Sequence, residues 1–416
     1  MTSFWHPFAS MGKVEKAPFI VDRAAGAYLY DREGNRYLDG TAGLWFCQVG
    51  YGRKEIVDAI AAQATRLHAF HTFGDFTNPT TEHLAERIAA IAPMPGGKVF
   101  FTSGGSDSVD TAAKLTRRYF HEIGQPDRTV FVYRDWAYHG MHAYGTSFSG
   151  MAANAEGHGP MITDIVKVPW DSLDELEAAV EEMGPHRLAG FFAEPVIGAG
   201  GVRFPPDGYL KGAQQIIHEA GGFFISDEVI TGFGRVGAWF AATRFGLEPD
   251  LITFAKGVTS GYQPLGGVIA ASHVAEPFWS SEGAPMWRHG YTYSGHPTAA
   301  AAGLANLDIL QKEGLVERVL TLEGELVEAL APVAAHRAVS HVRHGAGFLA
   351  AVELAEDLMK ADPDFGARVA GACRRAGLIT RALGGSSLQI SPPLIMTSDQ
   401  LEELAERMLA GLDAAT

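Results

Sequence analysis

Short apolar runs bounded by turn residues mark the middle of this chain. Residues 188–192, 223–225 and 251–254 are three such runs, and they contain no regular alternation with polar residues. Continuous runs of this length are typical of strands that are covered on both faces in a parallel sheet. Between the runs, apolar residues recur every three or four positions, which predicts helices such as 209–220. The pattern therefore favours an α/β fold.

The two ends of the chain show a different pattern. Near the amino end, residues 27–30 and 36–39 flank a polar turn and are predicted to form a hairpin. In the last hundred residues strands and helices alternate, which indicates an α+β unit. Its predicted elements are strands over 347–354 and 377–381, an apolar segment over 388–394, and helices over 365–376 and around 401–412.

Charged side chains follow two of the central runs. The run 223–225 leads to Asp227, and the run 251–254 is followed by Lys256. Ligands of open α/β sheets bind outside the carboxyl ends of the strands, so both side chains are expected at one crevice. A lysine amine forms a Schiff base with pyridoxal phosphate (PLP), and a buried carboxylate keeps the ring nitrogen of that cofactor protonated. We therefore predict that Lys256 and Asp227 are the catalytic residues of a PLP enzyme.

The composition of the chain excludes some classes of binding partner and indicates the cellular compartment. The formal net charge is −15, which argues against a surface for nucleic acid or for an anionic membrane. Two cysteines provide no disulfide framework, so a reducing cytosol is expected. We see neither a signal peptide at the amino end nor an apolar run of membrane-spanning length.

Three segments in order resemble class III (subgroup II) PLP-dependent aminotransferases: DEVITGFGR at 227–235, Pro-Asp at 249–250 and Ala-Lys at 255–256. The resemblance extends over nearly the whole chain. Within the class it is closest to the ω-amine:pyruvate group, which includes β-alanine:pyruvate enzymes. The segments that point to this group are residues 43–52, the loop around Thr292 and residues 391–394.

The resemblance implies PLP fold type I, with a large domain built on a mostly parallel seven-stranded sheet and a small α+β domain. The expected boundaries are 1–55 for the first part of the small domain, 56–305 for the large domain and 306–416 for the rest of the small domain. The resemblance also implies a homodimer with shared active sites, which in turn could pair into a tetramer. No metal is expected.

The resemblance further assigns residues to the cofactor and the substrate. A Gly/Ser turn at a helix start suits a phosphate, and Gly105 and Ser106 match the phosphate cup of the family, although Gly104 and Asp107 depart from its usual Asn/Ser-Gly-Ser-Glu. The other residues expected at the cofactor are Tyr138, which stacks on the ring, Val229, and Thr292, which binds the phosphate of the neighbouring subunit. Expected substrate residues are Trp45, Tyr138 and Arg381, with His139 and Glu194 behind the cofactor site.

The implied reaction has two halves, in which an amine first loses its amino group and pyruvate then receives it. Arg381 is expected to swing in for the acceptor's carboxylate and out for an apolar amine, since a guanidinium fork pairs with both carboxylate oxygens. Three alternatives stay open: a class III enzyme for diaminopelargonate or ornithine-type substrates, a decarboxylase or aminomutase on the same fold, and a ligand-binding module on a degenerate enzyme fold. A panel of donors against pyruvate and 2-oxoglutarate, product analysis, and a cofactor absorption band that borohydride bleaches would distinguish these.

Overall fold

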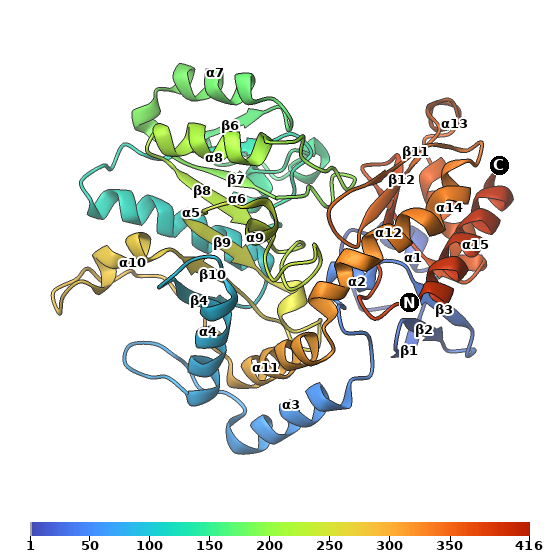
Figure 1. Ribbon diagram of the computed structural model, residues 1–416, viewed down its shortest axis with the longest axis horizontal. Coiled ribbons are helices and arrows are strands. Elements are labelled where there is room, and N and C mark those ends of the chain that lie inside the picture. Colours follow the sequence, from blue (N-terminus) through green and yellow to red (C-terminus); the bar gives the residue numbers. More distant parts are fainter. Residues whose placement is uncertain (1) are drawn as a thin grey trace.

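A computed structural model describes residues 2–416, and a seven-stranded sheet forms the centre of its larger part (Figure 1). The strand order is β4-β10-β9-β8-β7-β5-β6. The strands run parallel except β10, which is antiparallel to both of its neighbours. The predicted mostly parallel sheet is therefore confirmed. Its strands are β4 Lys98–Thr102, β5 Val130–Arg134, β6 Ile165–Val168, β7 Leu188–Ala193, β8 Phe223–Asp227, β9 Leu251–Phe254 and β10 Gly266–Ala270.

Both faces of this sheet are covered, which explains the continuous apolar runs. Successive residues of a strand point to opposite faces. In β8, Phe223 and Ile225 pack in a cluster with α5 (Gly105–Glu122), whereas Phe224 packs in the cluster that contains α8 (Tyr209–Glu219). A strand with solvent on one face would have alternated apolar and polar residues.

Elements from both ends of the chain lie side by side in the smaller part of the molecule, where Figure 1 shows the blue and red segments together. Strand β13 pairs in parallel with β3 of the amino-terminal hairpin. The two four-stranded sheets have the orders β1-β2-β3-β13 and β11-β12-β15-β14. Their strands are β1 Val21–Ala25, β2 Tyr28–Asp31, β3 Arg36–Asp39, β11 Val339–His344, β12 Ala350–Leu354, β13 Leu378–Ile379, β14 Ala382–Leu383 and β15 Ser387–Ile390.

The remaining helices connect or cover these sheets. Their bounds are α1 Met11–Val14, α2 Ala42–Trp45, α3 Lys54–Leu67, α4 Pro79–Ile91, α6 Ala143–Ser147, α7 Leu173–Met183, α9 Ala241–Phe245, α10 Ser272–Trp279, α11 Pro297–Lys312, α12 Leu315–Ala334, α13 Glu356–Ala361, α14 Phe365–Arg375 and α15 Ser398–Ala415. The expected domain boundaries at 55/56 and 305/306 fall inside α3 and α11, and the division into domains stays a prediction.

The smaller part differs from the sequence expectation in its strands. Strand β12 begins at Ala350 instead of 347, and β13 ends at Ile379, two residues before Arg381. Strand β11 was not predicted because its sequence, VSHVRH, is mostly polar; its burial pattern is mixed, and Val339 is its one buried residue. Residues 42–45 form a distorted helical turn in which Gly43 and Leu44 are not helical.

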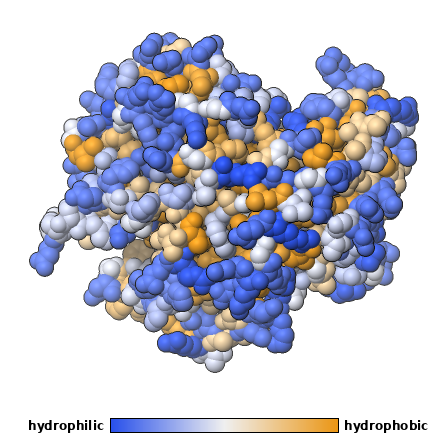
Figure 2. Space-filling model, in the orientation of Figure 1, coloured by the Kyte–Doolittle hydropathy of each residue, from blue (hydrophilic) through white to orange (hydrophobic). Residues whose placement is uncertain are grey.

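The surface of the molecule is mainly hydrophilic on the face shown in Figure 2, with hydrophobic residues gathered near the middle of that face. Among residues 2–416, no helix combines the length and the apolar character that a membrane span requires.

Candidate active site

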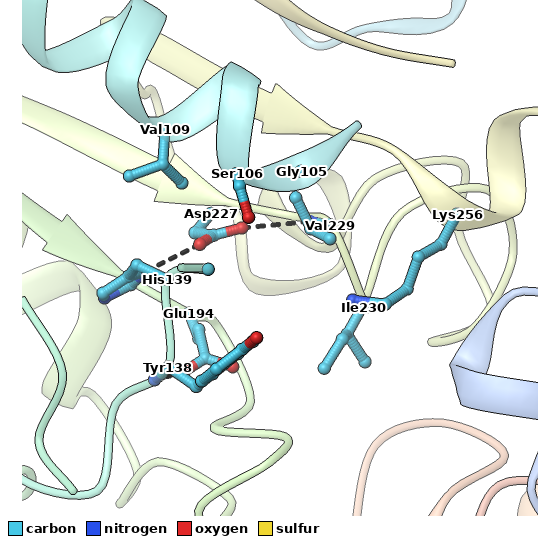
Figure 3. Close-up of a pocket in the computed structure, with 11 residues that line it drawn as sticks. Gly105, Ser106, Val109, Tyr138, His139, Glu194, Asp227, Val229, Ile230 and Lys256 are labelled. Atoms are coloured by element: carbon cyan, nitrogen blue, oxygen red, sulfur yellow. Dashed lines mark hydrogen bonds and ion pairs between the residues drawn. The ribbon is translucent and has the colours of Figure 1, made fainter. Parts of the chain in front are cut away.

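A cavity opens at the carboxyl ends of β8 and β9, beside the first turn of α5 (Figure 3). Asp227 is the last residue of β8, and Lys256 follows β9 by two residues, so the parallel strands bring them to the same edge. The cavity is lined by Gly105, Ser106, Val109, Tyr138, His139, Gly140, Glu194, Asp227, Val229, Ile230 and Lys256.

Asp227 is held rigidly from three sides. Oδ2 lies 2.6 Å from Nδ1 of the fully buried His139, and Oδ1 accepts the hydroxyl of Thr253 at 3.0 Å and the backbone N–H of Val229 at 3.1 Å. Thr253 lies opposite Asp227 in the register of β8 and β9. These bonds fix the orientation of the carboxylate towards whatever occupies the cavity.

Lys256 approaches the cavity from the side opposite Tyr138 and His139 (Figure 3). It has a backbone φ of 47°, in the left-handed region that residues with a Cβ rarely adopt, and it begins a short turn over Lys256–Val258. Burial lowers the pKa of its amine to about 8, although Asp227 and Glu194 oppose this shift. An amine with such a pKa is a nucleophile and a base near neutral pH.

Glu194 follows β7 and is buried beside Tyr138. Its carboxylate accepts the backbone N–H groups of Tyr138 at 2.9 Å and Gly198 at 3.0 Å. Burial raises the pKa of this carboxyl, and the nearby charge of Asp227 adds to the effect. The fully buried Arg134 donates to the backbone carbonyl of Glu194. Glu194 therefore fixes the backbone that carries Tyr138.

The start of α5 forms an anion cradle that fits a phosphate ester. No side chain caps this helix, so the N–H groups of its first turn are available. A Cβ at Gly105 would lie 2.9 Å from Val229 Cγ1, and one at Gly140 would lie 2.5 Å from Ser106 Oγ. Glycine is therefore required at both walls. With a fixed carboxylate and a half-buried lysine across the cavity, the residues present fit PLP.

Three predicted residues lie outside this cavity. Arg381 lies beside it, between β13 and β14, with its guanidinium 4.6 Å above the ring of the buried Trp45. The charge of Arg381 acts on both Tyr138 and Lys256, and it helps to lower the pKa of the Lys256 amine. Thr292 is exposed in the loop before α11, as a residue that served a neighbouring subunit would be.

The cavity also contains residues that the sequence reasoning missed. They are the lining residues Val109, Gly140 and Ile230. Thr253, which does not line the cavity but bonds to Asp227 from the buried strand β9, was also missed. Thr253 could have been found, because it is the polar residue of an otherwise apolar strand that follows the one ending in Asp227. The lining residues carry no such signal, since apolar residues and glycine are common at strand and helix ends.

Comparison with known proteins gives the family context. The sequence model of the class III aminotransferase family matches residues 10–412. The chain is 38% identical over 412 residues to a putrescine–pyruvate aminotransferase of Pseudomonas aeruginosa, covering 94% of this chain and 89% of that protein.

Solved structures agree with this similarity. An (S)-enantioselective ω-transaminase from Thermomicrobium roseum superposes with a TM-score of 0.94 at 36% identity, covering 99% of this chain and 96% of the other. An amine transaminase from an uncultivated Pseudomonas species, in its PLP-bound form, superposes with a TM-score of 0.95 at 34% identity, covering 100% and 99%.

Proposed function

This chain belongs to the class III aminotransferases, which use PLP, and from that membership we propose that it moves an amino group from an ω-amino acid or primary amine to pyruvate. One observation supports pyruvate, a keto acid, as the amino-group acceptor. Arg381 places a cation beside the cavity and on the face of Trp45, and it has no carboxylate partner among residues 2–416. A site that combines an unpaired guanidinium with an aromatic wall suits both a keto acid and an apolar amine.

We propose the following roles for the residues at the cavity and around it. Bound PLP supplies an electron sink that stabilises negative charge on the substrate carbon. Lys256 holds the cofactor and moves the proton to and from the substrate carbon, and Asp227 keeps the ring nitrogen charged. The phosphate would be held by Gly105 and Ser106 and, from a second chain, by Thr292. Tyr138 and Val229 would contact the ring, and His139 and Glu194 hold Asp227 and Tyr138 in place.

The Arg381→Ala variant tests the acceptor. We expect its KM for pyruvate to rise about 10- to 100-fold, because a paired guanidinium–carboxylate contact is lost, while its KM for an arylalkyl amine changes little. Steady-state kinetics with each substrate varied in turn measure both constants. Equal changes in the two KM values would refute the role of Arg381 as the acceptor's partner.

A donor panel tests the activity as a whole. Wild-type enzyme is assayed with ω-amino acids, diamines and arylalkyl amines against pyruvate and 2-oxoglutarate. Turnover with 2-oxoglutarate alone would favour the diaminopelargonate or ornithine-type alternatives. Release of carbon dioxide or an isomerised amine would indicate the decarboxylase or aminomutase.

The pKa of Lys256 predicts how cofactor loading depends on pH. Burial lowers this pKa from 10.5 to about 8, so the reactive neutral amine is lost as the pH falls below about 8. We expect the rate constant for loading PLP into the apoenzyme to rise about tenfold from pH 6 to pH 7 and to level off above about pH 8. Stopped-flow absorbance measures this rate, and a profile that still rises steeply at pH 10 would contradict the lowered pKa.

We also propose that the enzyme is a homodimer, which could pair into a tetramer. The exposed aromatic side chains of Phe76 and Trp279 line one groove together with the edge strand β4 and the segment 294–295, and the exposed ring of Phe73 lies against Gly290. Exposed aromatic patches of this kind mark interfaces. In the proposed dimer the exposed Thr292 serves the site of the second copy. Light scattering that found only monomers in the active enzyme would contradict this assembly.

The cytosol is the compartment that we propose. Cys47 and Cys373 are free and buried. Reduced thiols are the usual state in a cytosolic protein. Fractionation of the source cells should place the activity in the cytosol, and recovery in another fraction would overturn this assignment.

A further inference from the structure

The guanidinium of Arg381 is held by a buried amide. Its Nε donates to Oε1 of Gln389 at 2.7 Å, and its backbone carbonyl accepts the N–H of Gln389 at 2.9 Å. Gln389 lies in β15 and has no exposed surface. Neither terminal nitrogen of Arg381 makes a hydrogen bond to another described residue. The arginine is therefore anchored at one nitrogen and free at the other two.

The same amide reaches the turn that carries Trp45. Nε2 of Gln389 donates to Ser391 Oγ at 2.6 Å and lies 3.4 Å from the backbone carbonyl of Thr41. That carbonyl also accepts the backbone N–H of Trp45 at 3.1 Å. Gln389 thus contacts both the guanidinium and the turn whose tryptophan ring lies below it.

This arrangement fixes how Arg381 meets a substrate. A carboxylate pairs with an arginine through two parallel N–H groups, which are either the two terminal nitrogens or Nε with one of them. Because Nε is occupied by Gln389, the two terminal nitrogens are the pair that remains. If the Arg381 guanidinium moved away, the buried Oε1 of Gln389 would lose its hydrogen-bond donor. A buried acceptor without a donor is unfavourable. The Gln389 amide therefore stabilises the observed position of the Arg381 guanidinium relative to one in which the side chain points away from Gln389.

We propose that Gln389 is a positioning residue that holds Arg381 on the ring of Trp45 and directs its two terminal nitrogens to the substrate carboxylate. The inference rests on the proposed function, since it assigns the carboxylate-bearing substrate to Arg381. Gln389 itself does not touch the substrate. It acts by selecting the orientation of the arginine and by tying that orientation to the turn at Thr41.

The Gln389→Met variant tests this role, because methionine keeps the length of the side chain and removes the amide. We expect the KM for pyruvate to rise about tenfold, with kcat and the KM for an arylalkyl amine within about twofold of wild type. In the Arg381→Ala background the same substitution should add no further change to the pyruvate KM. The Ser387→Ala variant is the matched control, since Ser387 is buried in the same strand and bonds to Leu383 instead of to Arg381.

A binding measurement separates this inference from the proposed function. Propionate, a carboxylate that does not react, is titrated calorimetrically into PLP-loaded protein. Its Kd should weaken about tenfold in Gln389→Met and stay near wild type in Ser387→Ala. Should wild type fail to use pyruvate, the proposed function fails, and the propionate titration still decides whether Gln389 positions Arg381.

A second variant covers the case in which Gln389→Met does not fold. Gln389→Glu keeps the acceptor and adds a charge that pairs with the guanidinium, so it should weaken propionate binding further than methionine does. Unchanged propionate binding in a folded Gln389 variant would overturn the inference. So would equal increases in the two KM values, or a further increase in pyruvate KM in the Arg381→Ala background.

Discussion

The Lys256→Ala variant should lose at least about 10⁴-fold in kcat, because one side chain both holds the cofactor and carries the substrate proton. The variant should fold, since alanine keeps the Cβ at the same left-handed φ of 47° and removes an amine whose burial is unfavourable. Single-turnover kinetics with added PLP measure the loss, and circular dichroism checks the fold.

The matched control is Lys211→Ala, which removes an exposed lysine from α8 in the same part of the molecule. It should leave kcat unchanged. A small molecule amine such as methylamine, added to Lys256→Ala, should restore part of the proton transfer. Retention of more than about a tenth of wild-type kcat by Lys256→Ala would show that another group performs the chemistry.

The Asp227→Asn variant should lower kcat by about 10²- to 10³-fold, since it removes the fixed charge opposite the cofactor ring and keeps the shape of the side chain. Its neighbours still have partners, because an amide oxygen accepts the bonds from Thr253 and Val229. PLP should still bind, so the loss should appear in kcat and leave cofactor affinity within about tenfold of wild type. Stopped-flow kinetics with saturating PLP separate the two effects.

Asp250→Asn is the control for this substitution. Asp250 is also buried and bonded to imidazoles, those of His218 and His273, but it lies at the opposite end of the sheet, just before β9. Its replacement should lower the melting temperature and leave kcat per folded molecule unchanged. If both asparagine variants lost activity equally, the effect would reflect damage to the sheet instead of a missing charge at the cofactor.

The strand ends at the cavity were predictable because parallel strands obey a simple rule. Asp227 and Lys256 each follow a short apolar run, and the carboxyl ends of such strands meet at one edge. The register of β8 and β9 brings the two residues together without any knowledge of the loops between them. The predicted hairpin depends on an equally local pattern and is found as the pair β2 and β3.

Other features depend on contacts that local patterns do not encode. The bond between Gln389 and Thr41 joins residues 348 positions apart, and nothing in either segment indicates it. Arg134 is fully buried although arginine usually signals a surface.

The places of His139 and Glu194 came from the family resemblance alone, because a histidine or glutamate after a strand is more often solvated. Strand β11 was missed because most of its residues are polar, and its place is set by pairing with β12, which is distant from any local pattern.

The covalent bond between Lys256 and PLP is the claim on which the mechanism rests, and reduction with borohydride tests it most directly. The reduced holoenzyme is digested and its peptides are weighed by mass spectrometry. Our account predicts the mass of the reduced cofactor on the peptide that contains Lys256, together with loss of the visible absorption band. An unmodified Lys256 in protein that is otherwise active, or the cofactor mass on a different lysine, would contradict it.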